Sequence, residues 1–343
     1  MTKHLKYKLP KPDNYNPNSK EHKELFEVDA EYDCFAPYIK DYKDVRISTN
    51  SVIFNYFKVF EESCISQQNF KSYGEGYKFF LKFIFPKFKF TNKRFILITD
   101  EWTSNYYHWH TFSLIRLYAL IEQNLAKDSL LFLPKIYQKY PFVLPSLKKF
   151  GIKEQQIVYL RRKSNIKVKN LSFPITTRHH PQLLSKVRDT MINNTKLDLD
   201  LGDKIYISRT KRILRNVENE DKVMEVLQKY GFKKVVMENY SYDEQISIIN
   251  HTKYLIGPHG AGMLNIMFLP KDATALELAT TQINTDHTHN RDFYVLSKML
   301  GHKYFYQYCD YGQHNHICNF HCGNINVDLS ELEKNVKLML NGL

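Results

Sequence analysis

The sequence YLIGPHGAGMLN, at residues 254–265, carries the clearest structural signal in the chain. Its apolar beginning indicates a buried strand, which ends at Gly257 and Pro258, and small residues then lead into an apolar run that Pro270 closes. Glycine lets a ligand approach the backbone, and the free N–H groups at a helix start attract an anion. The stretch therefore predicts a strand, a phosphate-binding turn and a helix, although such a turn also occurs without a ligand.

Strand and helix patterns alternate on both sides of this turn. Ser241 and Glu244 form a capping box that starts one helix, and Gly231 stops another. The alternation predicts a mostly parallel sheet in a Rossmann-like domain, residues 179–325, on which an amphipathic helix at 326–343 docks. Its strands are predicted at 204–208, 233–237, 254–256, 274–279 and 303–306.

The first half of the chain alternates in the same way, and residues 46–178 are assigned to a first Rossmann-like domain. Its strands are followed by a helix that Thr103 or Ser104 is expected to cap and by another over 137–150. Residues 1–45 are polar and are expected to form an irregular arm on the surface. The fold class is therefore α/β, with two domains and parallel sheets. The strands of the first domain are predicted at 94–99, 130–133 and 157–160.

Composition is typical of a folded protein, because 25% of the 343 residues are charged and 43% are hydrophobic. The 49 Lys and Arg exceed the 36 Asp and Glu, and the net charge of +13 favours an anionic partner such as a nucleotide, an acidic glycan, a lipid headgroup or a nucleic acid. Residues 1–17 lack the apolar core of a signal peptide, no apolar run has membrane-spanning length, and the five cysteines suit reduced thiols. A cytoplasmic location is expected.

Aromatic and apolar residues at 77–90 are interspersed with Lys78, Lys82, Lys87 and Lys89. Such a segment can lie on a membrane surface with its lysines toward anionic headgroups. The same pattern is more typical of a half-buried strand or helix. Peripheral association with the inner face of a membrane is therefore expected only as the second interpretation.

Charged or small residues follow the predicted strands of the second domain. In open parallel sheets the ligand binds outside the carboxyl ends of the strands, so these residues are expected to converge. Arginine side chains and a helix start suit a diphosphate, and a carboxylate suits the hydroxyl groups of a ribose. The pattern predicts a nucleotide site that includes Arg209, Arg212, His259, Gly260 and Glu277.

With these motifs the sequence resembles glycosyltransferase family 61. The resemblance extends from about residue 94 to residue 280. It rests on ISR at 207–209 with Arg212 and Asn216, on GPHGAGMLN at 257–265, on the LEL around Glu277, and on NYYHW at 105–109.

The resemblance implies a GT-B-like fold of two facing Rossmann-like domains. It implies inverting transfer of a sugar, without a metal or another cofactor, from a nucleotide donor that is expected to be a UDP sugar. The second domain would hold this donor, and the first would hold a glycan or lipid-linked acceptor. The implied donor site comprises Arg209 and Arg212 at the diphosphate, Pro258, His259, Gly260, Ala261 and Gly262 at its phosphates or sugar, Glu277 at the ribose, and Asn216.

The general base is left open by the resemblance. The family commonly has an Asp shortly after the His-Trp pair, where this chain continues with HTF. An inverting transfer needs a base near the acceptor hydroxyl. His108 and His110 are the candidates, with Asp100 and Glu101 as alternatives, and each histidine is equally well explained as a core or capping imidazole.

Two patterns resemble metal sites but are interpreted otherwise. Asp198 and Asp200 have the Asp-x-Asp form of metal-dependent sugar transferases, yet they lie in a polar segment before Gly202 and predict a turn. Three cysteines and three histidines lie within 309–322, but no Cys-x-x-Cys pair occurs among them, so zinc is the less favoured interpretation. No metal site is predicted.

The predicted function is the transfer of a sugar to a glycan or lipid-linked acceptor, in the synthesis of a surface polysaccharide. Nucleic acid is not expected as a partner of such an enzyme. The alternative is a non-catalytic protein that binds nucleotide or nucleic acid, including an inactive relative of the enzymes.

Overall fold

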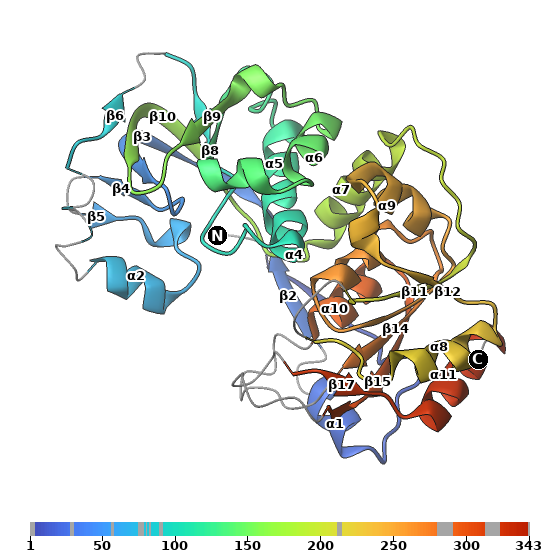
Figure 1. The fold of residues 1–343 in the computed structure, drawn as a ribbon. Helices are drawn as coiled ribbons and strands as arrows, with labels where there is room; N and C mark the ends of the chain where they lie inside the picture. The colour runs from blue at the N-terminus through green and yellow to red at the C-terminus, as the bar shows by residue number, and fades with distance from the viewer. Residues whose placement is uncertain are drawn as a thin grey trace. The chain divides into compact units, whose positions relative to one another are not determined.

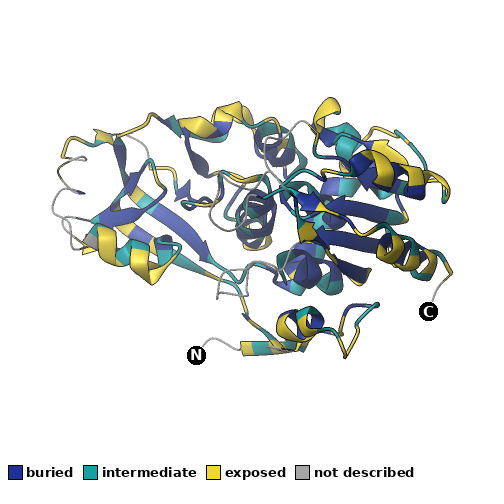
Figure 2. Ribbon diagram, turned by 60° about the horizontal axis from the view of Figure 1, so that its bottom comes forward, coloured by how far each residue is buried: buried dark blue, intermediate teal, exposed yellow. Residues whose placement is uncertain are grey.

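Two compact units make up the chain. The structure, a computed structural model, describes residues 4–27, 31–55, 58–74, 79, 81, 84–88, 92–210, 215–279, 291–312 and 323–341. The first unit comprises Met1–Leu5 and Cys34–Met191, and the second comprises Lys6–Asp33 and Ile192–Leu343 (Figure 1). Each unit has its own sheet and its own buried core, and the sheet strands are the most buried elements (Figure 2).

The main sheet of the second unit is entirely parallel, which confirms the predicted α/β class. Its strands lie in the order β12-β11-β13-β14-β15. Numbered along the chain this order is 2-1-3-4-5, a common doubly wound order that differs from the 3-2-1-4-5-6 order of dinucleotide-binding domains. The order reverses between β11 and β13. The strands are β11 (Lys204–Ile207), β12 (Lys233–Val235), β13 (Tyr254–Pro258), β14 (Thr274–Ala279) and β15 (Lys303–Tyr308).

Helices cover both faces of this sheet. On one face α8 and α11 pack together, and their apolar side chains share a core with Tyr206, Ile256 and Phe305 of the strands. Successive strand residues point to opposite faces, so Ile205 and Leu255 turn to the other face, on which η6 contacts α9 and α10. The bounds are α8 (Glu220–Gln228), α9 (Tyr242–Asn250), η6 (Ala261–Phe268), α10 (Asp292–Met299) and α11 (Leu329–Asn341), with the short elements η5 (Met237–Asn239), β16 (Asp310–Tyr311) and β17 (Ile325–Asn326).

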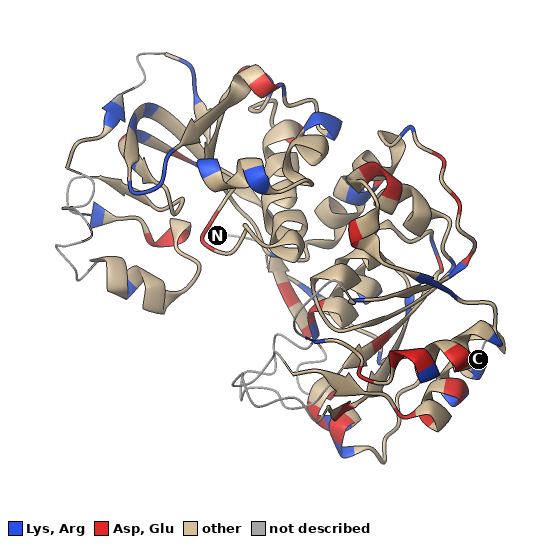
Figure 3. Cartoon of the chain, in the orientation of Figure 1, with Lys and Arg blue, Asp and Glu red and all other residues tan. Residues whose placement is uncertain are grey.

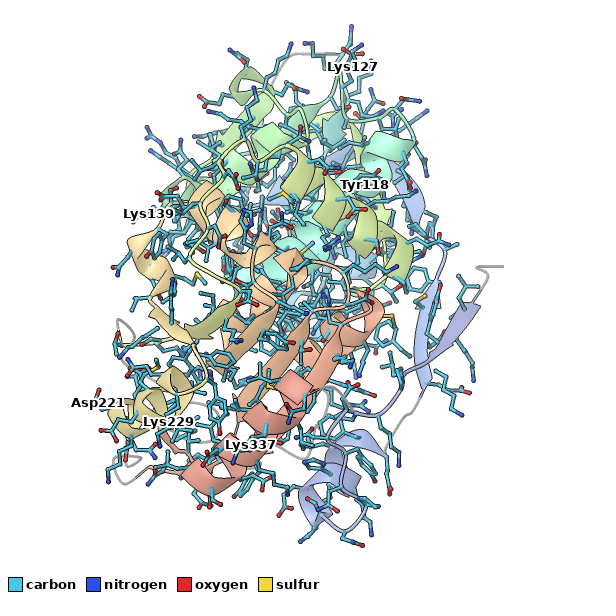
Figure 4. The ribbon with its side chains drawn as sticks, turned by 90° about the vertical axis from the view of Figure 1, so that its right-hand side faces the viewer. Tyr118, Lys127, Lys139, Asp221, Lys229 and Lys337 are labelled. Carbon is cyan, nitrogen blue, oxygen red and sulfur yellow. The ribbon has the colours of Figure 1, made fainter. Side chains whose placement is uncertain are left out.

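Local signals in the second unit act as predicted. The capping box at Ser241 is formed, because its hydroxyl accepts from the Glu244 N–H while the Glu244 carboxylate accepts from the Ser241 N–H. The outer face of α8 is charged. The side chains of Asp221 on α8, of its C-cap residue Lys229 and of Lys337 on α11 point into solvent (Figure 4). These helices are therefore amphipathic, with one face in the core and one in water.

The N-terminal segment is not the irregular arm that the sequence predicts. It contains β1 (His4–Lys8), α1 (Lys20–Phe26) and β2 (Glu31–Phe35), and β1 pairs with β2. Asn14 donates to the carbonyl of Tyr306 at 2.8 Å and accepts from its N–H at 3.0 Å, so its side chain acts as a further strand residue at the edge of β15. The ring of Phe26 in α1 packs against the rings of Tyr294 and Tyr306. An exposed sheet edge offers unpaired backbone groups, and covering it gives this polar segment a fixed structure.

The sheet of the first unit is mixed rather than parallel. Its order is β5-β4-β3-β10-β7-β8-β9, with β6 beside β10. Strands β6 to β10 are parallel to one another, whereas β3, β4 and β5 pair antiparallel, because the connections between them are too short for a crossover. The strands are β3 (Tyr38–Ser48), β4 (Ile53–Asn55), β5 (Lys58–Val59), β6 (Lys87–Phe88), β7 (Phe95–Ile96), β8 (Leu130–Pro134), β9 (Ile157–Leu160) and β10 (Asn165–Ile175).

Helices of the first unit depart from the prediction in two places. Pro141 splits the helix expected over 137–150 into η3 and α6, since proline cannot continue a helix. The division between the units lies within α7, after Met191, rather than at residue 178, and Lys186 of α7 forms an ion pair with Glu122 of α5. The elements are η1 (Glu61–Ser63), α2 (Gln67–Gly74), α4 (Tyr106–His108), the π-helix η2 (Trp109–Ser113), α5 (Leu114–Glu122), η3 (Lys135–Lys139), α6 (Val143–Lys149), η4 (Glu154–Gln156) and α7 (Pro181–Asn193).

Half of the aromatic and lysine-rich stretch at 77–90, including Lys78, Lys82 and Lys89, lies outside the described residues. Among the helices that the structure describes, none has the length and apolar character needed to span a bilayer.

Candidate active site

The candidate donor site lies at the point of the second sheet where the strand order reverses. Strand β11 ends at Ile207 and is followed by Ser208 and Arg209, and the adjacent β13 ends at Pro258 and is followed by His259. The His259 N–H donates to Leu278 at 2.8 Å, so the chain is still held to the sheet at this residue. Doubly wound sheets bind ligands in the crevice at such a reversal.

Gly260 brings Arg209 against the turn. Its φ of +143° lies in a region that residues with a Cβ rarely adopt, and a Cβ there would overlap the Arg209 guanidinium, 2.9 Å from Cζ. At Gly257 a Cβ would approach Met263 Sδ to 2.8 Å. The glycines therefore allow the guanidinium to lie on the backbone of the turn and η6 to pack closely on β13. The helix predicted after the turn is present as a 3₁₀-helix.

Glu277 and His259 form a buried pair behind this turn. Nδ1 of His259 lies 2.5 Å from Oε1 of Glu277, and the Tyr304 hydroxyl donates to Oε2. The Glu277 side chain is 0% exposed and the His259 side chain 25% exposed. Burial, and then the nearby carboxylate of Glu277, raise the pKa of the Tyr304 phenol, so it remains a donor. The Phe293 ring flanks the imidazole at 5.3 Å between centroids.

The structure brings together several of the residues assigned to the donor. Arg209, Gly260, His259 and Glu277 converge at this turn as expected. Both Glu277 oxygens bond to protein side chains, and none of its side chain is exposed. The backbone of Asn216 bonds to Asn324 and Ile325, and Arg212 lies outside the described residues.

In the first unit, the two acidic alternatives for the base have structural partners. Oδ1 of Asp100 accepts from the N–H groups of Trp102 and Thr103, and Oδ2 lies 2.8 Å from Nη1 of Arg116. Glu101 accepts from the Tyr73 hydroxyl and from Asn69 of α2. Asp100 therefore holds the turn after β7, and Glu101 holds α2 to that turn.

The two candidate histidines lie on either side of the start of a π-helix. Asn105 caps α4 by accepting from the Tyr107 N–H at 2.8 Å, in place of the predicted Thr103 or Ser104. The chain then passes into the π-helical turn η2, a geometry that often occurs at functional sites.

Only one of these histidines has an accessible surface. His110 is completely buried, with Nδ1 2.7 Å from the Tyr106 carbonyl, and burial lowers its pKa to about 4. His108 is partly exposed and lies beside the exposed ring of Trp102, with 5.4 Å between ring centroids. Of the two, His108 is the one that a substrate can reach.

A second cluster beside His108 was missed from the sequence. The Tyr107 hydroxyl and Nε2 of His179 are 2.6 Å apart, and the Arg178 guanidinium lies 4.8 Å from the centroid of Phe112. Burial, followed by the charges of Arg178 and His108, lowers the pKa of His179 well below its ordinary value. His179 follows β10, the neighbour of β7, so the rule of convergent strand ends could have found it.

The two metal-like patterns have separate outcomes. The predicted turn at Asp200 is confirmed, since its Oδ1 accepts from the Gly202 N–H at 2.6 Å, and Asp198 bonds to His251. Cys309 is a buried free thiol, while the other cysteines and histidines of that cluster lie outside the described residues. In the described part of the chain, no group of three or more His, Cys, Asp or Glu has the arrangement of a metal site.

Comparison with known proteins identifies related sequences. The family model Glycosyltransferase 61 matches residues 106–276, about half of the chain. An EGF domain-specific O-linked N-acetylglucosamine transferase of Drosophila melanogaster is 38% identical over 76 residues, 21% of this chain and 14% of that protein. A protein O-linked-mannose beta-1,4-N-acetylglucosaminyltransferase 2 of Mus musculus is 25% identical over 99 residues, 28% of this chain and 17% of the relative. The chain thus matches less than a fifth of the length of these relatives.

Proposed function

Because the chain belongs to glycosyltransferase family 61, we propose that it transfers a sugar from a UDP-sugar donor to a glycan or lipid-linked acceptor, with inversion and without a metal. The observation that carries this proposal is the convergence of Arg209, Gly260 and His259 at the strand-order reversal of the second sheet. A guanidinium lying on a glycine turn, beside an imidazole, suits a diphosphate. Both relatives are named as N-acetylglucosamine transferases, so UDP-N-acetylglucosamine is the first donor to test.

The GT-B-type arrangement of two facing domains is part of the same proposal. The donor is assigned to the second unit, whose sheet is fully parallel, and the acceptor to the first. The first sheet is mixed, and its parallel strand β7 leads to the helix start that carries His108.

We assign the general base to His108. It takes the proton of the acceptor hydroxyl while that oxygen bonds to the anomeric carbon and the bond from this carbon to the diphosphate breaks. His110 is completely buried, Asp100 is paired with Arg116, and Glu101 is bonded to Tyr73. Arg209 and His259 stabilise the negative charge that develops on the leaving diphosphate.

We also propose where the enzyme acts. It would transfer the sugar during synthesis of a surface polysaccharide, in the cytoplasm at the inner face of a membrane. Support comes from three exposed apolar side chains next to Lys87 in the first unit: Leu81 is 55%, Ile84 51% and Phe85 90% exposed. Apolar groups beside lysines favour contact with anionic lipid. Binding of the purified chain to anionic but not to neutral vesicles, lost in Phe85→Ser, tests this part.

Thermal unfolding with nucleotides tests the donor site. A ligand at a hundred times its Kd stabilises the folded state by about 2.7 kcal/mol, a measurable shift in Tm. We expect UDP and UDP-N-acetylglucosamine to raise Tm in EDTA, with no further rise in magnesium or manganese, and Arg209→Ala to abolish the shift. Arg188→Ala, at an arginine of α7 in the first unit, is the control and should keep it. If no nucleotide raises Tm, the proposed donor site is wrong.

Nucleic acid is the competing ligand for a chain of net charge +13. In Figure 3 the described Lys and Arg residues are spread over both units among acidic residues. A nucleic-acid binder loses affinity steeply with salt in proportion to the phosphates that it contacts. Salt-sensitive binding of an oligonucleotide, together with no nucleotide shift, would replace the transferase proposal.

A further inference from the structure

We propose that Glu277 and Tyr304 are positioning residues, which hold the Nδ1 side of the His259 ring in the core so that Nε2 faces the donor diphosphate. The inference rests on the proposed donor site and gives Glu277 a role other than ribose binding. It also adds Tyr304, which no sequence motif indicates.

Glu277 holds the His259 ring from the side of the core. Glu277 lies opposite Gly257 of β13 and Tyr306 of β15 in the parallel register, so its side chain comes from the strand between them. One carboxylate oxygen is bonded to Nδ1 of His259 at 2.5 Å and the other to the Tyr304 hydroxyl. With Nδ1 engaged in the core and a quarter of the side chain exposed, Nε2 is the nitrogen left for a ligand.

Burial makes this arrangement costly unless each group has its partner. A carboxylate with no exposure requires hydrogen bonds or a counter-charge. Tyr304 supplies an O–H to one carboxylate oxygen, and His259 supplies an N–H to the other.

Groups from the neighbouring elements lie around the Glu277–His259 pair. From β14 comes the carboxylate, and from β15 come two phenols. Arg209 at the turn carries a permanent positive charge, and α10 adds an aromatic ring against the imidazole. These residues are Glu277, Tyr304, Tyr306, Arg209 and Phe293.

The first test needs no nucleotide. An imidazole N–H bonded to a buried carboxylate gives a far-downfield proton NMR signal, which we expect in the full-length protein and not in His259→Asn. Glu277→Gln should move it upfield, because a neutral amide is the weaker acceptor. Tyr306→Phe is the matched control, since this phenol is a neighbour on the same strand whose hydroxyl has no partner among the described residues. An unmoved signal in Glu277→Gln would overturn the inference.

The second test measures UDP affinity at pH 7 by calorimetry. In Glu277→Gln we expect about tenfold weaker binding, because the His259 ring is no longer held toward the diphosphate. Tyr304→Phe should show a smaller loss, and Tyr306→Phe should match the wild type.

The outcomes separate the inference from the function on which it rests. A downfield signal with no UDP affinity retains the positioning of His259 and refutes the donor site. Equal UDP affinity in Glu277→Gln and wild type retains the donor site and refutes the positioning role.

Discussion

Each unit buries one carboxylate near the carboxyl end of a parallel strand, but the two carboxylates have different partners. In the first unit the Asp100 side chain, 2% exposed, pairs with an arginine that is only 9% exposed, Arg116. In the second unit Glu277, 0% exposed, pairs with His259, which is 25% exposed. The first pair is enclosed on both sides, whereas the second has one member that reaches the surface. The proposed donor site depends on this difference, because only a partly exposed partner can contact a ligand.

The largest effect is expected from breaking the pair of the first unit. Asp100→Ala leaves Arg116 buried without its counter-charge, which should lower the free energy of unfolding by about 3–5 kcal/mol. Asp41→Ala is the control, because the Asp41 side chain is 59% exposed beside Arg94, and such a pair contributes about 0–1 kcal/mol. Urea denaturation followed by tryptophan fluorescence measures both. Equal losses would show that burial of the partner does not set the cost.

A second prediction concerns the buried imidazole of the first unit, His110. Burial lowers the pKa of His110 to about 4, below the ordinary value of about 6.5, so the unfolded chain binds the extra proton first as the pH falls. This stabilising contribution is complete above about pH 6.5 and decreases by about 3 kcal/mol as the pH falls to 4. His110→Gln should therefore flatten the loss of stability between these pH values, measured by urea unfolding. A slope equal to that of the wild type would contradict the burial of a neutral imidazole.

The third prediction concerns the support of Glu277 in the second unit. Tyr304→Phe removes the donor to one carboxylate oxygen and leaves it buried without a partner, which should cost about 1–3 kcal/mol of unfolding free energy. Tyr306→Phe removes a buried hydroxyl that has no hydrogen-bond partner among the described residues, so its cost should be smaller. Chemical denaturation at pH 7 compares the two. The comparison fails if Tyr306→Phe is the more destabilising change.

The smallest effect on stability, but a clear effect on binding, is expected at the turn. In Gly260→Ala the new Cβ overlaps the Arg209 guanidinium, so UDP affinity should fall by about tenfold or more. Gly151→Ala is the control, because Gly151 also has a positive φ, of +76°, yet a Cβ there meets nothing within 4 Å. Both variants carry backbone strain, and only the first should weaken UDP in calorimetry. Similar affinities in the two variants would remove Arg209 from the donor site.

Local patterns were sufficient to predict most of the second unit. The strands at β11, β13, β14 and β15, the capping box at Ser241 and the glycine turn all follow from signals within a few residues. The family prediction is confirmed as well, because its motifs depend on the same short stretches. The first unit was predicted less well, since its antiparallel strands lack a clear periodicity. The N-terminal segment, most of which belongs to the second unit, lacks one too.

Partners of the buried polar groups could not be predicted in this way. Asp100 and Arg116, or His259 and Glu277, are separated along the chain, and whether they meet depends on which strands are neighbours and which face each side chain takes. His108 and His110 are two residues apart, and the turn around the π-helix leaves one partly exposed and the other buried.

The amino-acid order thus specifies the alternating strands, the glycine turn and the family, because hydrophobic period and turn chemistry are local properties. The tertiary structure specifies the strand order 2-1-3-4-5, the buried ion pair between Asp100 and Arg116, and the contact between Glu277 and His259. Lateral strand pairing and burial arise from contacts between distant residues. Those contacts determine which charged groups are enclosed in the fold and which reach a ligand.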